Sequence, residues 1–212
     1  MRDELPPGGA VFSDDEIDAR WAQAWRPEQV VERLSGVEAP WYVAAGWALD
    51  LFRGGQTRVH ADLEIAVPAA GSSEVRACFP ELVCDAVGTG RVWEEAGAEV
   101  LAATHQTWFR DPRSGRYQFD VFREPHERGM WVCRRDASVR LPYEVIVERT
   151  EAGIPYLVPE LVLLFKAKAV RAKDQADFDG VLPLLGRAGR EALRGWLELV
   201  HPGHPWLARL AG

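Results

Sequence analysis

The sequence has few cysteines and no long apolar segment. Its three cysteines, Cys78, Cys84 and Cys133, form no C-x-x-C pair, which argues against a disulfide framework and a cysteine-ligated zinc site. No apolar run approaches the roughly 20 residues that a membrane-spanning helix needs. The opening MRDELPPGGAVFSDDE has no apolar stretch after its charges, unlike a secretory signal. We therefore expect a cytoplasmic protein with no membrane partner.

The sequence also lacks an excess of basic residues. With 25 Lys and Arg against 32 Asp and Glu, the formal net charge is -7. Proteins that coat nucleic acid carry a basic stripe, so this balance argues against a nucleic acid partner. With 212 residues, 47% of them hydrophobic, the chain is long enough to bury a sizeable core without disulfide bonds or structural metal ions. It has no internal repeat.

Lysine is scarce and clustered. Only Lys166, Lys168 and Lys173 are lysines among the 25 basic residues, and they stand within eight positions. Lysine offers a compact charge on a flexible stem, a common solution for binding phosphate. The alternative is an ordinary solvated helix face.

Periodicity and turn signals predict an α+β fold, a mixed sheet with flanking helices followed by a helical region. The part up to residue 156 forms the α/β core and residues 157–212 the helical region, with no flexible linker between them. We expect helices over 14–24, 27–35, 46–54, 72–79, 159–171, 174–185, 190–199 and 205–210, and strands over 41–45, 62–67, 81–87, 104–110, 116–123, 129–134, 143–148 and 154–157.

Three acids in predicted strands are the strongest chemical signal. Asp62 and Glu64 are two positions apart and therefore project from one face of a strand. Asp120 is the only acid inside the apolar strand that contains it. Neighbouring carboxylates repel each other unless a cation lies between them, and Mg²⁺ prefers such oxygen ligands. The alternatives are a solvated edge strand for the pair and a salt bridge to arginine for Asp120.

A strand-to-helix turn precedes the paired acids. Gly46, between Ala45 and Trp47, lets backbone N–H groups approach a ligand, and the start of a helix favours an anion. Arg58 and His60 follow in the segment T-R-x-H. His60 is a phosphate donor in one interpretation and an ordinary loop histidine in the other. Together with the acids and lysines, these features indicate phosphoryl-type transfer with metal ions.

At these residues the chain resembles the nucleotidyltransferase superfamily with the polymerase-β-like core. Within it, the chain is most similar to the aminoglycoside and lincosamide nucleotidyltransferases. The similar stretches are WYVAAGWALDLFRGGQTRVHADLEIAV, YQFDVF and YLVPELVLLFKAKAVRAKDQADFDGVLPLL. The family usually has two glycines before the tryptophan, whereas this chain has Ala45-Gly46. The added methyl group is expected to crowd the nucleotide phosphates.

The resemblance implies a role for each candidate residue. Asp62, Glu64 and Asp120 would be the catalytic residues and the ligands of two Mg²⁺ ions, with Asp120 as ligand, general base or both. The remaining candidates would bind ATP or another nucleoside triphosphate: Ala45, Gly46, Trp47, Arg58, His60, Lys166 and Lys173.

The resemblance also implies an enzyme that transfers a nucleoside monophosphate to a hydroxyl of a small molecule, such as an aminoglycoside or a lincosamide. Glu124 and Glu127 are candidates to meet a cationic acceptor, although surface charge is the favoured interpretation of both. The alternatives are a tRNA or protein acceptor and an inactive nucleotide-binding homologue. We expect a monomer or a homodimer.

Overall fold

The computed structural model describes residues 5–211, which divide into two compact units. Unit 1 comprises residues up to 43 together with 59–126. Unit 2 comprises residues 44–58 together with 127 onward. Helix α3 therefore belongs to unit 2, although it follows strand β1 of unit 1 directly. The predicted boundary after residue 156 stays a prediction.

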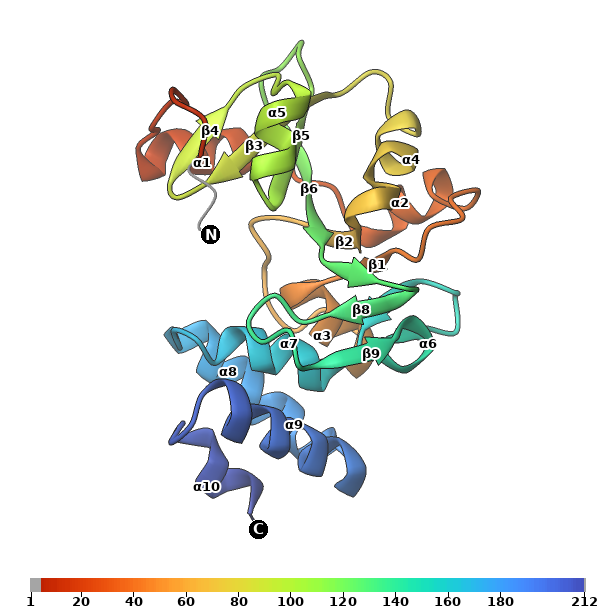
Figure 1. The fold of residues 1–212 in the computed structure, drawn as a ribbon, viewed down its shortest axis with the longest axis vertical. Coiled ribbons are helices and arrows are strands. Elements are labelled where there is room, and N and C mark those ends of the chain that lie inside the picture. Colours follow the sequence, from red (N-terminus) through yellow and green to blue (C-terminus); the bar gives the residue numbers. More distant parts are fainter. Residues whose placement is uncertain (1–4, 212) are drawn as a thin grey trace. The chain divides into compact units, whose positions relative to one another are not determined.

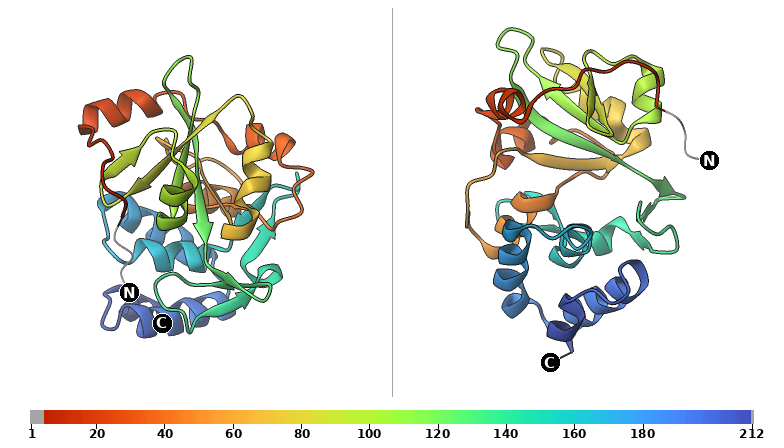
Figure 2. Two further views of the ribbon diagram at one scale, coloured as in Figure 1. Left: turned by 45° about the horizontal axis from the view of Figure 1, so that its top comes forward. Right: turned by 90° about the vertical axis from the view of Figure 1, so that its left-hand side faces the viewer.

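Unit 1 is built on a mixed sheet whose strands run in the order β1-β2-β6-β5-β3-β4. Strands β2 and β6 are parallel, and the other neighbours are antiparallel. The long strands β5 and β6 form a hairpin (Figure 2). The elements of unit 1 are α1 (Asp14–Trp21), α2 (Pro27–Arg33), β1 (Tyr42–Val43), β2 (Glu64–Pro68), η1 (Ala69–Gly71), α4 (Ser72–Ala77), β3 (Val83–Gly88), β4 (Arg91–Trp93), α5 (Ala98–Ala103), β5 (Gln106–Arg110) and β6 (Tyr117–Glu124) (Figure 1).

Aromatic rings fill one face of this sheet. Phe119 stacks on Phe109 with ring centroids 4.5 Å apart, and Phe79 packs on Phe119 at 4.7 Å. Leu63 and Ile65 of the neighbouring chain segment are fully buried. Because side chains alternate along a strand, this packing sends the even-numbered residues of β6 to the opposite face.

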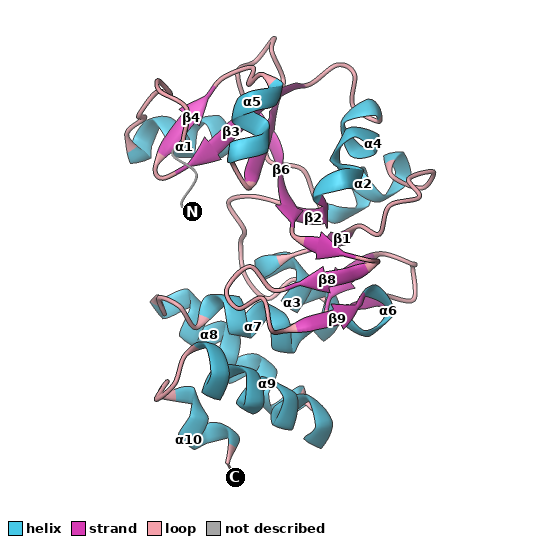
Figure 3. Cartoon of the chain, in the orientation of Figure 1, coloured by secondary structure: helices cyan, strands magenta, loops and turns pink. Residues whose placement is uncertain are grey.

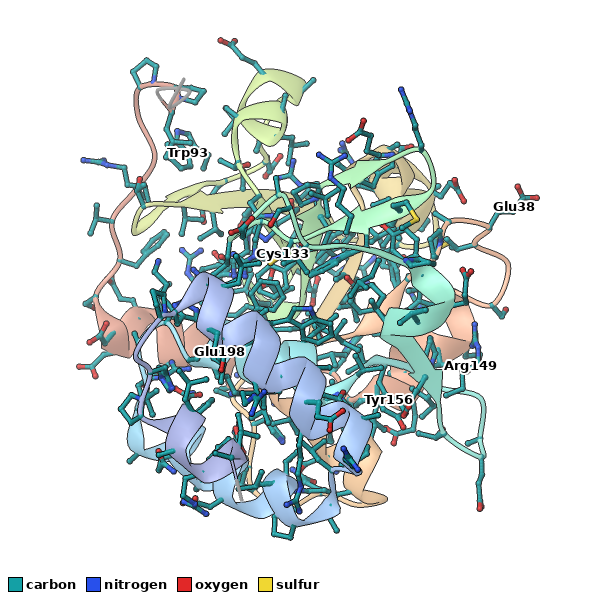
Figure 4. All side chains as sticks on the ribbon, turned by 60° about the horizontal axis from the view of Figure 1, so that its bottom comes forward. Glu38, Trp93, Cys133, Arg149, Tyr156 and Glu198 are labelled. Atoms are coloured by element: carbon teal, nitrogen blue, oxygen red, sulfur yellow. The ribbon has the colours of Figure 1, made fainter. Side chains whose placement is uncertain are left out.

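Unit 2 is mostly helical, and among the described residues no strand follows β11 (Figure 3). Phe178 and Trp206 stack at 4.2 Å and join α8 to α10. In the β10–β11 hairpin, Tyr156 is labelled in Figure 4. Its hydroxyl donates to Glu148 at 2.8 Å. The elements are α3 (Ala45–Arg53), β8 (Met130–Val132), β9 (Arg140–Pro142), α6 (Tyr143–Ile146), β10 (Val147–Arg149), β11 (Pro155–Leu157), α7 (Pro159–Lys166), α8 (Ala172–Val181), η2 (Leu182–Leu184), α9 (Arg187–Val200) and α10 (Trp206–Leu210), with β7 (His126–Glu127) at the unit boundary.

Most predicted elements are present, and four predictions need correction. The predicted strand over 143–148 is a short helix, α6, followed by β10. The helix predicted over 159–171 ends at Lys166, so the lysines do not share one helix. Strand β2 begins at Glu64, two residues after Asp62. Elements β4, α5 and β9 were not predicted. Among residues 5–211, no helix combines the length and apolarity of a membrane span.

Candidate active site

Parallel pairing of β2 with β6 places two of the predicted acids side by side. Glu64 and Asp120 are register partners on these strands. The backbone N–H of Asp120 donates to the Leu63 carbonyl at 2.8 Å, which fixes that register. Leu63 is buried on the core side, so Glu64 projects from the opposite face together with Asp120. We call Asp62, Glu64 and Asp120 the carboxylate cluster.

Asp120 is the most buried acid of the carboxylate cluster, with 1% of its surface exposed. The amide of Gln106 donates to its Oδ2 atom, while Oδ1 has no hydrogen-bond partner among the described residues. Burial raises the pKa of Asp120 well above its usual range, and the negative charges of Glu64 and then Asp62 raise it further, against hydrogen bonds from Gln106 and Trp108 that lower it.

The carboxylate cluster offers the donor chemistry that Mg²⁺ prefers. Its ligands would be carboxylate oxygens, and the buried Oδ1 of Asp120 is the kind of orphaned acceptor that a cation would satisfy. The described side chains form no group of three acidic, histidine or cysteine residues already spaced for one ion. The acids therefore fit the ion in chemistry, and Glu64 with Asp120 is the pair best placed to hold it.

Glu124 continues the row of polar side chains on this face of β6. It lies four residues after Asp120, and only 4% of its surface is exposed. The Nε2 atom of His105 is 3.9 Å from its carboxylate. The surface-charge interpretation is therefore wrong for Glu124. It holds for Glu127, which is exposed and pairs with Arg140.

A separate cavity of about 150 Å³ lies on the other face of the same strands. Its lining includes Thr107 and Phe109 of β5 and Val121 and Arg123 of β6. These residues alternate with Asp120 along the strands, so the cavity is not next to the carboxylate cluster.

In unit 2, helix α3 begins in an unusual backbone conformation. Ala45, its first residue, has φ +49°, in the left-handed region that favours glycine. The helix was predicted to open at Gly46, one residue later. Gly46 and Trp47 are both buried in its first turn. The position where the family usually has glycine thus adopts a conformation that glycine accommodates best.

The segment after α3 is tied back to two helices of unit 2. The Thr57 hydroxyl donates to Asp50 at 2.5 Å and accepts a hydrogen bond from Arg53 at 2.8 Å. Arg58 meets Asp177 of α8 through two hydrogen bonds, Nε to Oδ1 at 3.3 Å and Nη2 to Oδ2 at 3.2 Å. His60, also predicted to bind nucleotide, lies in unit 1 and is half-buried.

Lys166 is buried in a group of opposite charges. Its ammonium lies 2.8 Å from Asp174 and 3.0 Å from Asp177, and its side chain is 9% exposed. Arg171 also binds Asp174, at 2.7 Å. We call Arg58, Lys166, Arg171, Asp174 and Asp177 the ion network. Lys173 lies outside it and is exposed.

The two acids of the ion network are ionised despite their burial. Burial alone would raise the pKa of Asp174, but hydrogen bonds from Arg171 and Lys166 lower it far below its usual range. Burial also opposes ionisation of Asp177, and Arg58 and then Lys166 lower its pKa. Sequence reasoning missed both acids. Their i, i+3 spacing in AKDQADFDGV puts them on one helix face, a signal that could have drawn attention to them.

Part of the chain matches a known protein family. Residues 28–106 match the family model of aminoglycoside-2''-adenylyltransferase. The matched range includes Ala45, Arg58, Asp62 and Glu64, and it ends before Asp120. A search of curated proteins finds no significant match.

Two solved structures resemble the chain. The lincomycin-bound lincosamide antibiotic adenylyltransferase LnuA aligns with a TM-score of 0.54 and 13% identity, over 83% of this chain and 100% of its own. The solution structure of the antibiotic-resistance factor ANT(2'')-Ia aligns with a TM-score of 0.51 and 15% identity, over 81% of this chain and 89% of its own. The fold is that of the antibiotic nucleotidyltransferases. The predicted resemblance and fold class are confirmed, and together the comparisons support a nucleotidyltransferase.

Proposed function

We propose that this nucleotidyltransferase transfers a nucleoside monophosphate from ATP or another nucleoside triphosphate to a hydroxyl group of an aminoglycoside- or lincosamide-like antibiotic. The observation that carries the proposal is the pairing of Glu64 with Asp120, whose buried Oδ1 lacks a hydrogen-bond partner among the described residues. The family match and the two structural neighbours support the same reaction class.

In the proposed reaction, Asp120 accepts the proton of the acceptor hydroxyl. Its pKa is raised by burial and by the neighbouring carboxylates, which makes its ionised form a stronger base than an ordinary aspartate. The acceptor oxygen then forms a bond to the α-phosphorus. The bond between that phosphorus and the bridging oxygen breaks, and pyrophosphate leaves with the electron pair.

We assign the carboxylate cluster as the ligand set for Mg²⁺, which when bound would neutralise charge on the triphosphate. In unit 2, we assign Arg58 and Lys166 to the nucleotide phosphates, and the backbone of Ala45, Gly46 and Trp47 with them. His60 and Lys173 stay candidates for the same phosphates.

Glu124 stays a candidate to meet a cationic acceptor. It shares the Asp120 face of β6 and is nearly fully buried, with the Nε2 atom of His105 3.9 Å from its carboxylate.

The test is a screen of nucleoside triphosphates against hydroxylated antibiotics, with pyrophosphate release as the readout. We expect release with at least one pair, dependent on Mg²⁺. Asp120→Asn should lower kcat by roughly 10²–10⁴-fold, the usual range for losing a general base. Chromatography and mass spectrometry of the antibiotic should show one added nucleoside monophosphate.

A second candidate function is an inactive nucleotide-binding homologue, which the strained Ala45 favours. It would replace our proposal if calorimetry detects triphosphate binding while no antibiotic in the screen yields pyrophosphate. A tRNA or protein acceptor would replace the antibiotic if only those acceptors became labelled from an α-labelled triphosphate.

A further inference from the structure

We infer that Asp177 is a positioning residue that orients the Arg58 guanidinium toward the nucleotide phosphates; this inference rests on the proposed function. Asp177 reaches Arg58 with both carboxylate oxygens, at 3.3 Å and 3.2 Å. Such a two-point contact fixes the plane of a guanidinium, whereas a single contact leaves it free to rotate.

The segment carrying Arg58 needs such an anchor. It follows Gly54, which ends α3 in the left-handed conformation at φ +80°, and a side chain at Gly54 or Gly55 would meet nothing within 4 Å. An arginine on an open loop loses side-chain entropy when it is fixed. Because Asp177 already restricts the Arg58 side chain in the folded protein, nucleotide binding costs less side-chain entropy.

Asp177 is itself held by two further contacts. Its carboxylate lies 3.0 Å from the Lys166 ammonium, and its backbone carbonyl accepts a hydrogen bond from Arg53 at 3.3 Å. Arg53 also donates to the side-chain hydroxyl of Thr57, the residue before Arg58. Helix α8 thus contacts the Arg58 side chain directly and the Thr57 side chain through Arg53.

Close approach of Arg53 to α8 depends on Gly180. A Cβ atom at Gly180 would lie 1.8 Å from an Arg53 guanidinium nitrogen. A glycine in the middle of a helix costs stability relative to alanine, so its presence here is explained by the room it leaves. Gly180 thus leaves room for Arg53, and Arg53 joins Asp177 of α8 to Thr57, the residue before Arg58.

The consequence is a role for Asp177 in nucleotide affinity rather than in proton transfer. Asp177 belongs to unit 2, and it is ionised because Arg58 and Lys166 outweigh the effect of its burial. Removing its charge should loosen the Arg58 guanidinium, raise the dissociation constant for nucleotide and leave the chemical step nearly unchanged.

The experiment is a double-mutant cycle on the full chain, with ATP and Mg²⁺ as the calorimetric probe. We expect Asp177→Asn to raise Kd and KM for ATP about tenfold, with kcat within about twofold. Arg58→Lys keeps the charge but loses the two-point contact, and should weaken ATP binding similarly. Adding Asp177→Asn to Arg58→Lys should then have little further effect, because the two residues act as a unit.

Asp179→Asn is the matched control. Asp179 lies two residues further along α8 and pairs with Arg209 at 3.0 Å, so this change also removes an ion pair from the helix. It should leave ATP affinity unchanged. If Asp177→Asn and Arg58→Lys weaken binding additively, or if Asp177→Asn behaves like the control, the inference is overturned. If Asp177→Asn does not fold, the test uses Arg58→Lys alone. An unchanged Kd of Arg58→Lys for ATP would then overturn the inference as well. Absence of ATP binding by the wild type would instead refute the proposed function.

Discussion

A single side chain, Ala45, combines a steric cost with a conformational one. Its methyl group stands where the family usually has glycine, and its φ of +49° lies in the left-handed region. An alanine held there is about 1–2 kcal/mol less stable than in a right-handed conformation. Strain of this kind often lies at functional sites, and the start of α3 is the segment assigned above to the nucleotide.

We predict that Ala45→Gly lowers KM for the nucleotide about fivefold, because one crowded methyl is worth about 1 kcal/mol in a binding site. The sequence alone suggests a small stability loss, since glycine adds freedom to the unfolded chain. The observed φ reverses that expectation, because relief of strain offsets the loss, and urea unfolding should show equal or higher stability. Thr89→Gly is the control: Thr89 has the same φ of +49° in unit 1, and should gain stability without changing KM.

Among the helices, α8 has a low intrinsic preference for its conformation and is held by its contacts. Its sequence AKDQADFDGV contains three aspartates and a glycine, none of them favoured in a helix interior. Phe178, stacked on Trp206, and the buried Asp174 and Asp177 fix it in unit 2. Most of the stability of this helix therefore comes from packing and ion pairing.

We predict that Gly180→Ala fails to give the roughly 0.5–1 kcal/mol of stabilisation that alanine usually brings in place of a helical glycine. The new Cβ would displace the Arg53 guanidinium and its contacts with Thr57 and Asp177. Gly195→Ala in α9 is the control, since nothing lies within 4 Å of its Cβ position. It should stabilise the chain by about 0.5–1 kcal/mol in urea unfolding. Equal gains for both variants would contradict the packing argument.

Local patterns predicted the strands that carry the acids, because period-two alternation reports which face is buried. The stretch around Asp120 forms β6 as expected, and its register against Glu64 follows from pairing that no local pattern encodes. Residues 143–148 alternate weakly, and tertiary context made the first four of them a helix. The lysine cluster was visible in the sequence, but the partners of Lys166, Asp174 and Asp177, lie beyond a break between two helices.

Over the whole chain, the two groups of buried acids respond to pH in opposite directions. The pKa of Asp120 is raised, so its contribution to stability is fully present below about pH 4 and is lost as pH rises through its folded pKa. The pKa values of Asp174 and Asp177 are lowered, so their contributions are present above about pH 4 and are lost as pH falls through their folded values.

We therefore predict opposite pH dependence for two conservative variants. Asp120→Asn removes the charge that burial, Glu64 and Asp62 disfavour, so its free energy of unfolding should exceed that of the wild type at pH 8. That advantage should vanish near pH 4. Asp174→Asn removes one of the two carboxylates that Lys166 contacts, together with the Arg171 contact, so it should lose about 2 kcal/mol at pH 7 and progressively less below pH 4. Urea unfolding across this range measures both, and parallel curves for the two variants and the wild type would refute the assignment of charge states.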